Sequence, residues 1–128
     1  MDVLETYATM RYYQQEYGGS QISGTDLARS LYNASRHIDT LTFNRIVAKT
    51  FDGLTPFQQE VVQRVTCALA EWEAINEDVL QSAVSGYSIN GVSLSFGAGG
   101  TLYSQGGVIL PKTLYGELAQ TGLTYRGF

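Results

Sequence analysis

Apolar residues recur at helical spacing along the first part of the chain, and turn-forming residues separate the runs. A first short helix is predicted from about Thr9 through Met10 and Tyr13 to Tyr17. It should end at Gly18-Gly19, because glycine readily takes the left-handed conformation that closes a helix. A second helix of about four turns is predicted after a potential N-cap at residues 24–26. Its apolar positions are Leu27, Leu31, Ala34, Ile38 and Leu41, and Phe43 and Ile46 either extend it or form a short separate turn.

The strongest predicted element is a long helix from Pro56 to Val79. Thr55 as N-cap, Pro56 at the first helical position and Gln58 together form a capping box. The apolar side is expected to carry Phe57, Val61, Val65, Ala68, Leu69, Trp72, Ile75 and Val79, with Glu60, Arg64, Glu71 and Asp78 as a solvated stripe and Cys67, Ala70 and Ala74 as a strip of small residues. We expect this helix to be the centre of the fold, with neighbours on more than one face.

After the long helix, apolar residues no longer recur at helical spacing and instead occupy every second position. Alternating apolar positions on either side of Asn90-Gly91 predict a β-hairpin from Tyr87 to Phe96. Residues 97–107 are predicted to form a flexible, glycine-rich loop around Leu102 and Tyr103. Pro111 should open a last helix that ends at Gly122, followed by a tail from 123 to 128.

The predicted fold class is therefore mainly α. It is a small helical bundle around one long central helix, with a β-hairpin, a glycine-rich loop, a short C-terminal helix and a tail. A length of 128 residues fits a single domain. We expect a helical core at about 7–83, the hairpin and loop at about 85–110, and the C-terminal helix and tail at about 111–128.

Charge is distributed unevenly, since eleven of the twelve acidic residues precede residue 79, whereas ten of the fourteen glycines follow it. A net charge of -4 disfavours tight binding to nucleic acid, which depends on Lys and Arg displacing counterions from phosphates. Acidic residues near Met1 and the lack of a long apolar run lead us to expect neither export nor membrane insertion. Arg29, Arg36 and Arg45 leave a small DNA-binding protein as an alternative.

Residues capable of catalysis or metal binding are few. His37 is the only histidine and is interpreted as a surface or boundary residue. Cys67 is the only cysteine and is interpreted as a helix-packing residue. Four carboxylates, Glu71, Glu73, Glu77 and Asp78, lack the spacing of a calcium loop, and we interpret them as solvating the helix. We therefore expect no enzyme activity, no catalytic residue, no metal site and no cofactor.

Tyrosine is abundant, with nine residues gathered mainly near the N-terminus and in the glycine-rich half. Aromatic side chains contribute much of the energy of protein interfaces. An ordinary core with tyrosines at its rim explains the same count, so both interpretations stay open.

Three stretches together resemble the head-to-tail connector proteins, also called adaptor or head-completion proteins, of long-tailed bacteriophages and prophages of Gram-positive bacteria. They are Tyr7 to Gly19 with Ala34-Ser35-Arg36-His37-Ile38-Asp39 and Leu41-Thr42-Phe43-Asn44-Arg45-Ile46, the helix from Pro56 to Val79, and the ending from Leu118 to Gly127. The similarity covers most of the chain and consists of order and spacing, without a catalytic motif. Residues 97–107 match least.

The resemblance implies a non-enzymatic subunit of the virion neck, made in the host cytoplasm. It would form a ring of its own copies, twelvefold in the virion, on the portal protein, and would offer its far side to the next neck protein, a stopper or tail-end protein. DNA would pass through the ring without specific binding, and no membrane would be involved.

Two sets of residues follow as hypotheses from this resemblance. The tail residues Leu123, Tyr125, Arg126 and Phe128 would dock on the portal, and Tyr87, Ile89, Val92, Leu94, Phe96, Leu102 and Tyr103 would contact neighbouring subunits. The alternatives are a small DNA-binding packaging or regulatory protein and a helical interaction domain unrelated to phages.

Overall fold

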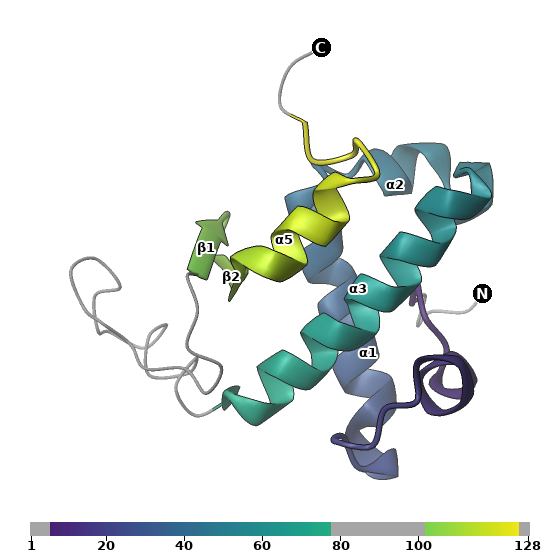
Figure 1. The fold of residues 1–128 in the computed structure, drawn as a ribbon, viewed down its shortest axis with the longest axis vertical. Helices are drawn as coiled ribbons and strands as arrows, with labels where there is room; N and C mark the ends of the chain where they lie inside the picture. The colour runs from purple at the N-terminus through teal and green to yellow at the C-terminus, as the bar shows by residue number, and fades with distance from the viewer. Residues whose placement is uncertain (1–5, 78–101, 126–128) are drawn as a thin grey trace.

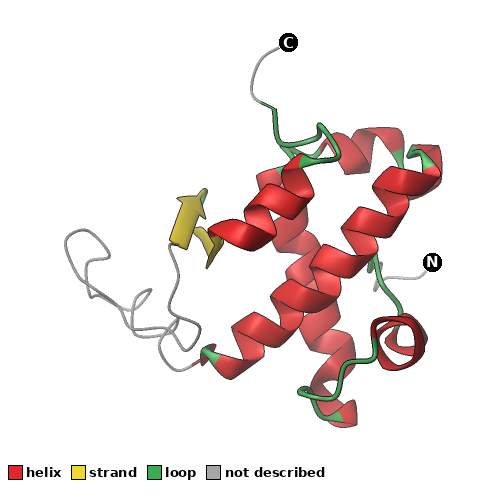
Figure 2. Cartoon of the chain, viewed as in Figure 1, coloured by secondary structure: helices red, strands yellow, loops and turns green. Residues whose placement is uncertain are grey.

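The computed structural model describes residues 6–77 and 102–125. The elements, in chain order, are a π-helical turn η1 (Tyr12–Tyr17), α1 (Gly24–Leu41), α2 (Arg45–Lys49), a 3-10 turn η2 (Phe51–Gly53), α3 (Pro56–Ile75), β1 (Leu102–Gln105), β2 (Val108–Pro111) and α5 (Lys112–Ala119). Figures 1 and 2 show a mainly helical molecule with one small two-stranded antiparallel hairpin and a short C-terminal helix. This is the predicted fold class.

The core lies where α1 crosses α3 (Figure 1). All five apolar residues predicted for the buried side of α1 are buried: Leu27, Leu31, Ala34, Ile38 and Leu41. Thr42 ends this helix by donating its hydroxyl to the carbonyl of Ile38 at 2.8 Å. Residues 43 and 44 then take positive φ angles, so α2 forms as a separate short helix. Of the two alternatives left open by the sequence, the short separate turn is therefore correct, and α1 does not extend through Phe43 and Ile46.

The long helix α3 begins as predicted. The Thr55 hydroxyl accepts from the Gln58 amide at 3.1 Å, and the Gln58 side chain accepts from the Thr55 amide at 2.9 Å. The helix ends at Ile75 with Asn76 as its C-cap, before the predicted end, and Val79 lies outside the described residues. The Trp72 carbonyl accepts from both the Asn76 side chain at 2.9 Å and the Asn76 backbone amide at 3.1 Å.

Helix α3 occupies the centre of the fold and packs against α1, α5, β2 and η1. Its strip of small residues is covered as predicted, since Cys67 and Ala70 are buried and Ala74 is packed against the core. Two residues of the predicted apolar side are exceptions, because Phe57 is 53% exposed and Ile75 is 61% exposed. Both lie at the ends of α3.

The structure describes a hairpin at residues 102–111, where the sequence predicted the end of a loop and the start of the last helix. Residues 102–107, predicted to belong to a flexible loop, form β1 and a two-residue turn instead. Gly106 and Gly107 both have positive φ angles, 59° and 87°, which matches the tight turn that a right-handed hairpin twist favours. The hairpin predicted from 87 to 96 lies outside the described residues.

Helix α5 follows β2 directly, with Pro111 as its N-cap, and packs on α3. Leu118 is fully buried, and the chain turns at Gly122, whose φ of 79° is left-handed. At the other end of the chain, the predicted first helix is present with π-helical geometry and ends at Gly18, whose φ is 77°. The predicted glycine stop at Gly18 is therefore confirmed, whereas the last helix ends at Ala119 with Gln120 as its C-cap, before the predicted end at Gly122.

Candidate protein-protein interface

Figure 1 shows α2, the start of α3 and the segment after α5 at one end of the molecule. Four large apolar side chains from these segments and from the turn before α2 are exposed to solvent. They are Phe43, 40% exposed, Val47, 58%, Phe57, 53%, and Tyr125, 68%. We call this group the end surface. Contiguous exposed apolar patches of more than a few hundred Å² mark interaction sites, whereas single exposed apolar residues are common on protein surfaces.

The turn between α1 and α2 places the first of these side chains. Phe43 and Asn44 have φ angles of 57° and 59°, a left-handed conformation that asparagine tolerates and that is strained for phenylalanine. The Arg45 guanidinium lies 5.0 Å from the centre of the Phe43 ring, within the range of a cation-π interaction. A conformation that costs energy and leaves an aromatic ring exposed is more typical of an interaction site than of a passive loop.

The C-terminal turn is tied to the same end by two side chains. Arg45 Nη1 donates to the Leu123 carbonyl at 2.8 Å, and Gln58 Nε2 donates to the Thr121 carbonyl at 3.0 Å. The Gln58 side chain thus caps α3 and also holds the C-terminal turn. Residues far apart in the sequence are joined into one surface.

The predicted portal-docking residues separate into different environments. Leu123 is only 4% exposed and belongs to the core, so its side chain is not available to a partner in this conformation. Tyr125 is the most exposed of the large apolar side chains in the described part of the chain. Arg126 and Phe128 lie outside the described residues.

The predicted subunit-interface residues are described only in part. Tyr87, Ile89, Val92, Leu94 and Phe96 lie outside the described residues. Leu102 and Tyr103 lie in β1 and are half-buried against the core. The Tyr103 ring stacks on Tyr115 of α5, with 3.9 Å between the ring centres, so at least part of its surface is used within the chain.

His37 lies at the boundary of the fold, as predicted, and has a specific partner. Its Nδ1 is 2.6 Å from Glu73 Oε2, and the pair joins α1 to α3. The hydrogen bond to Glu73 raises the pKa of His37, and burial opposes this only in part. A protonated His37 therefore forms an ion pair with Glu73.

The interpretation of the α3 carboxylates as a solvating group is wrong for Glu71 as well as for Glu73. Glu71 accepts a hydrogen bond from the Tyr13 hydroxyl at 2.6 Å and a longer one from Tyr17 at 3.4 Å. Nothing in the local sequence identifies this contact, since the tyrosines precede Glu71 by more than fifty residues. The (i, i+4) spacing of Tyr13 and Tyr17 was the only available sign that one group could meet both rings.

Cys67 is buried in the core, as expected for a helix-packing residue. Burial, followed by the charge of Glu71, raises the pKa of its thiol to about 12. The thiolate is the reactive form of cysteine, so this environment suppresses its chemistry.

The three arginines considered for DNA binding are all engaged within the chain. Arg36 pairs with Asp39 at 2.9 Å and lies over the rings of Tyr7 and Tyr32. Arg29 lies 3.3 Å from Asp26, and Arg45 holds the C-terminal turn. No observation favours the DNA-binding alternative over protein contacts.

Within residues 6–77 and 102–125, no three His, Cys, Asp or Glu side chains gather in a way that could hold a metal ion. None of the helices described there has both the length and the apolarity needed to cross a bilayer. Comparison with protein-family models, with curated protein sequences and with solved structures gives no match to this chain.

Proposed function

We propose that this chain is a structural subunit of the neck of a long-tailed bacteriophage. It forms a ring on the portal protein, joins the head to the tail and extends the DNA channel. The proposal combines the sequence resemblance described above with one structural observation, the end surface. This role requires no catalytic chemistry, because the chain would act by contacting other proteins.

The end surface carries the proposal because it combines exposed apolar groups with the emerging tail. Phe57 projects from the first turn of a capped helix, and the backbone of the C-terminal turn is held by Arg45 and Gln58. The exposed side chains therefore stand on anchored backbone, so docking them loses little conformational entropy. Burying one large apolar side chain contributes about 1.5–3 kcal/mol.

Ring formation requires a second, different contact surface. A head-to-tail contact between identical subunits joins two unlike patches and closes into a ring when the rotation permits. We assign portal binding to the end surface and to the tail that follows it. Neighbouring subunits and the next neck protein would use other faces, among them the region of β1 and β2.

Binding to the portal protein encoded in the same genome tests the proposal directly. The purified chain is mixed with that portal protein and analysed by co-sedimentation and electron microscopy, with the expectation of a ring on the portal. The variant Val47→Ser/Phe57→Ser should bind at least about tenfold more weakly, because two exposed anchors of the interface are lost.

The matched control is Ile75→Ser, which removes an equally exposed apolar side chain from the opposite end of the same helix. It should bind the portal like the wild type. Equal binding by the end-surface variant and the wild type would overturn the assignment of this surface. If the well-folded wild-type chain never associates with the portal, the neck assignment itself fails, and salt-sensitive DNA binding is the next property to measure.

The tail is tested separately in the phage. Deletion of residues 126–128 combined with Tyr125→Ser leaves the buried Leu123 in place. Full heads without attached tails are the expected product, whereas normal tailed particles would exclude a docking role for the tail.

A further inference from the structure

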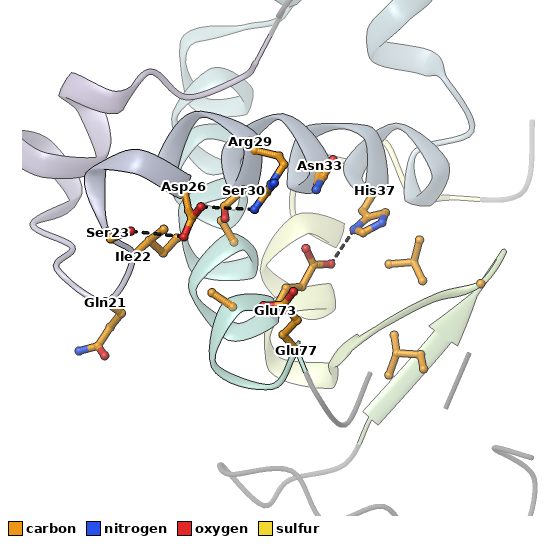
Figure 3. Close-up of a pocket in the computed structure, with 15 residues that line it drawn as sticks. Gln21, Ile22, Ser23, Asp26, Arg29, Ser30, Asn33, His37, Glu73 and Glu77 are labelled. Atoms are coloured by element: carbon orange, nitrogen blue, oxygen red, sulfur yellow. Dashed lines mark hydrogen bonds and ion pairs between the residues drawn. The ribbon is translucent and has the colours of Figure 1, made fainter. Parts of the chain in front are cut away.

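One polar contact joins the two helices that cross at the centre of the fold. His37 of α1 and Glu73 of α3 reach toward each other (Figure 3), with 2.6 Å between His37 Nδ1 and Glu73 Oε2. This distance is shorter than an ordinary N–H···O hydrogen bond, as expected where both partners carry a charge. The pair is therefore a polar cross-link beside the apolar packing of α1 on α3.

The two partners of this contact differ in their exposure to solvent. The His37 side chain is 40% exposed and lines a groove of about 780 Å³ between α1 and α3, so water can exchange protons with the ring. The Glu73 side chain is only 16% exposed. Its negative charge is therefore less screened than that of a fully solvated carboxylate, and the imidazole next to it responds strongly to that charge.

The strength of the contact depends on the protonation of the imidazole. A protonated ring donates from Nδ1 and also carries the positive charge that completes an ion pair. A neutral ring can still donate from Nδ1, but hydrogen bonds with charged donors and acceptors are roughly twice as strong as neutral ones. Loss of the proton should therefore weaken the cross-link without abolishing it.

Glu73 dominates the electrostatic surroundings of His37. Its hydrogen bond raises the pKa of His37, burial lowers that pKa in part, and the charge of Glu73 raises it further. The other charged side chains that line the groove are Asp26 and Arg29 of α1, which pair with each other at 3.3 Å, and Glu77 of α3. The described lining residues from the segment before α1 and from the hairpin carry no titratable side chain.

We propose that the contact between His37 and Glu73 is a proton-controlled clasp, which holds α1 on α3 most firmly when the imidazole is protonated and loosens when the imidazole is neutral. The folded chain binds this proton more tightly than the unfolded chain, in which a histidine titrates near about pH 6.5. The stability that the clasp contributes is therefore complete below about pH 6.5 and is lost as the pH rises through the higher pKa of the folded chain. The proposal does not rest on the neck function, since neither residue belongs to the end surface.

The titration of His37 tests the clasp directly, because this is the only histidine of the chain. Ring carbon-hydrogen signals of the untagged, ¹³C-labelled protein are followed by NMR from about pH 5 to about pH 9. The wild-type midpoint should lie above that of Glu73→Gln. Glu77→Gln is the matched control, because it removes an exposed carboxylate from the same helix and the same groove, and its midpoint should stay closer to the wild-type value.

Equal midpoints in the wild type and Glu73→Gln would overturn the proposal. If Glu73→Gln does not fold, the wild type unfolded in urea supplies the reference, and its midpoint should lie below that of the folded protein.

Urea unfolding then measures whether this proton controls the attachment of the helices. Between about pH 5.5 and about pH 8, the unfolding equilibrium constant of the wild type should rise at least about threefold more than that of His37→Gln. The variant retains a side chain that can donate to Glu73 but has no group that titrates there, so it subtracts the contribution of all other ionisable groups. Equal changes in the two proteins would exclude the clasp. Phe57→Ser should show the same pH dependence as the wild type, so failure at the end surface and failure of the clasp are separate results.

Discussion

The two ends of the described chain are attached to the helical core in different ways. The N-terminal segment, residues 6–22, is tied by tyrosine hydroxyls to carboxylates of α1 and α3: Tyr7 donates to Asp39 and Tyr13 donates to Glu71. The C-terminal turn, residues 120–125, is tied by its own carbonyls to side chains of α2 and α3. The N-terminal attachment uses tyrosine side chains together with the Tyr7 amide, which donates to Ser35 Oγ at 3.0 Å, whereas the C-terminal attachment uses backbone carbonyls.

The two ends therefore differ in which side chains remain available to a binding partner. Tyr13 is 1% exposed, and its hydroxyl also accepts from the amides of Gln21 and Ile22, so its polar group is fully used inside the fold. Tyr125 is 68% exposed, although the turn before it is anchored. Attachment through the backbone leaves a side chain free to project, which is why the C-terminal end is the better candidate for an interface.

The largest loss of stability should come from removing the Tyr13 side chain. Tyr13→Ala deletes a buried ring and leaves Glu71 without its closest donor, so we expect a loss of about 3–5 kcal/mol in the free energy of unfolding. Tyr125→Ala should change it by no more than about 0.5 kcal/mol, because that side chain is exposed. Urea unfolding of both variants measures the comparison. Similar losses for the two variants would contradict the distinction between the ends.

A smaller loss of stability is expected from a substitution at Gly19, which packs against the Tyr13 ring. A Cβ added there would lie 2.3 Å from Tyr13 Cε1, and the buried ring has little freedom to move aside. We expect Gly19→Ala to destabilise the fold by about 1–3 kcal/mol. Gly24→Ala is the matched control, since an added Cβ meets nothing within 4 Å, and it should be neutral or slightly stabilising. Thermal denaturation of both variants decides the point.

At the C-terminal end, Arg45→Met should cost about 0.5–1.5 kcal/mol, because it keeps the aliphatic stem and removes the hydrogen bond to the Leu123 carbonyl. Amide hydrogen exchange should increase in residues 120–125 and stay unchanged in the N-terminal segment. The control Arg11→Met removes an exposed arginine and should alter neither. Faster exchange at both ends would show that the two attachments are coupled.

The smallest effect is the contribution of Tyr17, in the N-terminal segment, to the dependence of stability on alkaline pH. Burial, followed by the charge of Glu71, raises the pKa of Tyr17 to about 12, whereas an unfolded tyrosine titrates near about 10. The protonated phenol therefore contributes stability that is complete below about pH 10 and is lost as the pH rises toward about 12.

Urea unfolding at about pH 9, 10 and 11 measures this loss. Tyr17→Phe removes the phenol, so this variant should lose less stability than the wild type across the same range. An identical decline in the two proteins would show that other groups cause the alkaline dependence.

Much of the helical architecture followed from local signals in the sequence. Thr55, Pro56 and Gln58 define the start of α3, and Gly18 marks the end of the first helix. The apolar spacing of α1 identified its buried face residue by residue. These features are local because a cap, a left-handed stop and a helical period each depend on residues within one or two turns.

The sequence alone misplaced features that depend on distant neighbours. The glycines at 106 and 107 were interpreted as part of a flexible loop, although they form the tight turn between β1 and β2. The residues of these two strands do not alternate between apolar and polar, so the sequence pattern gave no sign of them. The end of α3 was predicted too late, since the apolar period continues beyond Asn76 while the side chain of that residue closes the helix.

Only the tertiary structure decided the candidate sites. Leu123, expected to dock on a partner, is buried, whereas Phe57, expected to be buried, is exposed at the end surface. Glu71 and Glu73 differ from a solvated stripe because Tyr13 and His37 arrive from other elements. A sequence pattern specifies which side of a helix is apolar, but burial and hydrogen bonding depend on which other elements the chain brings against that side, and those elements come from remote positions in the sequence.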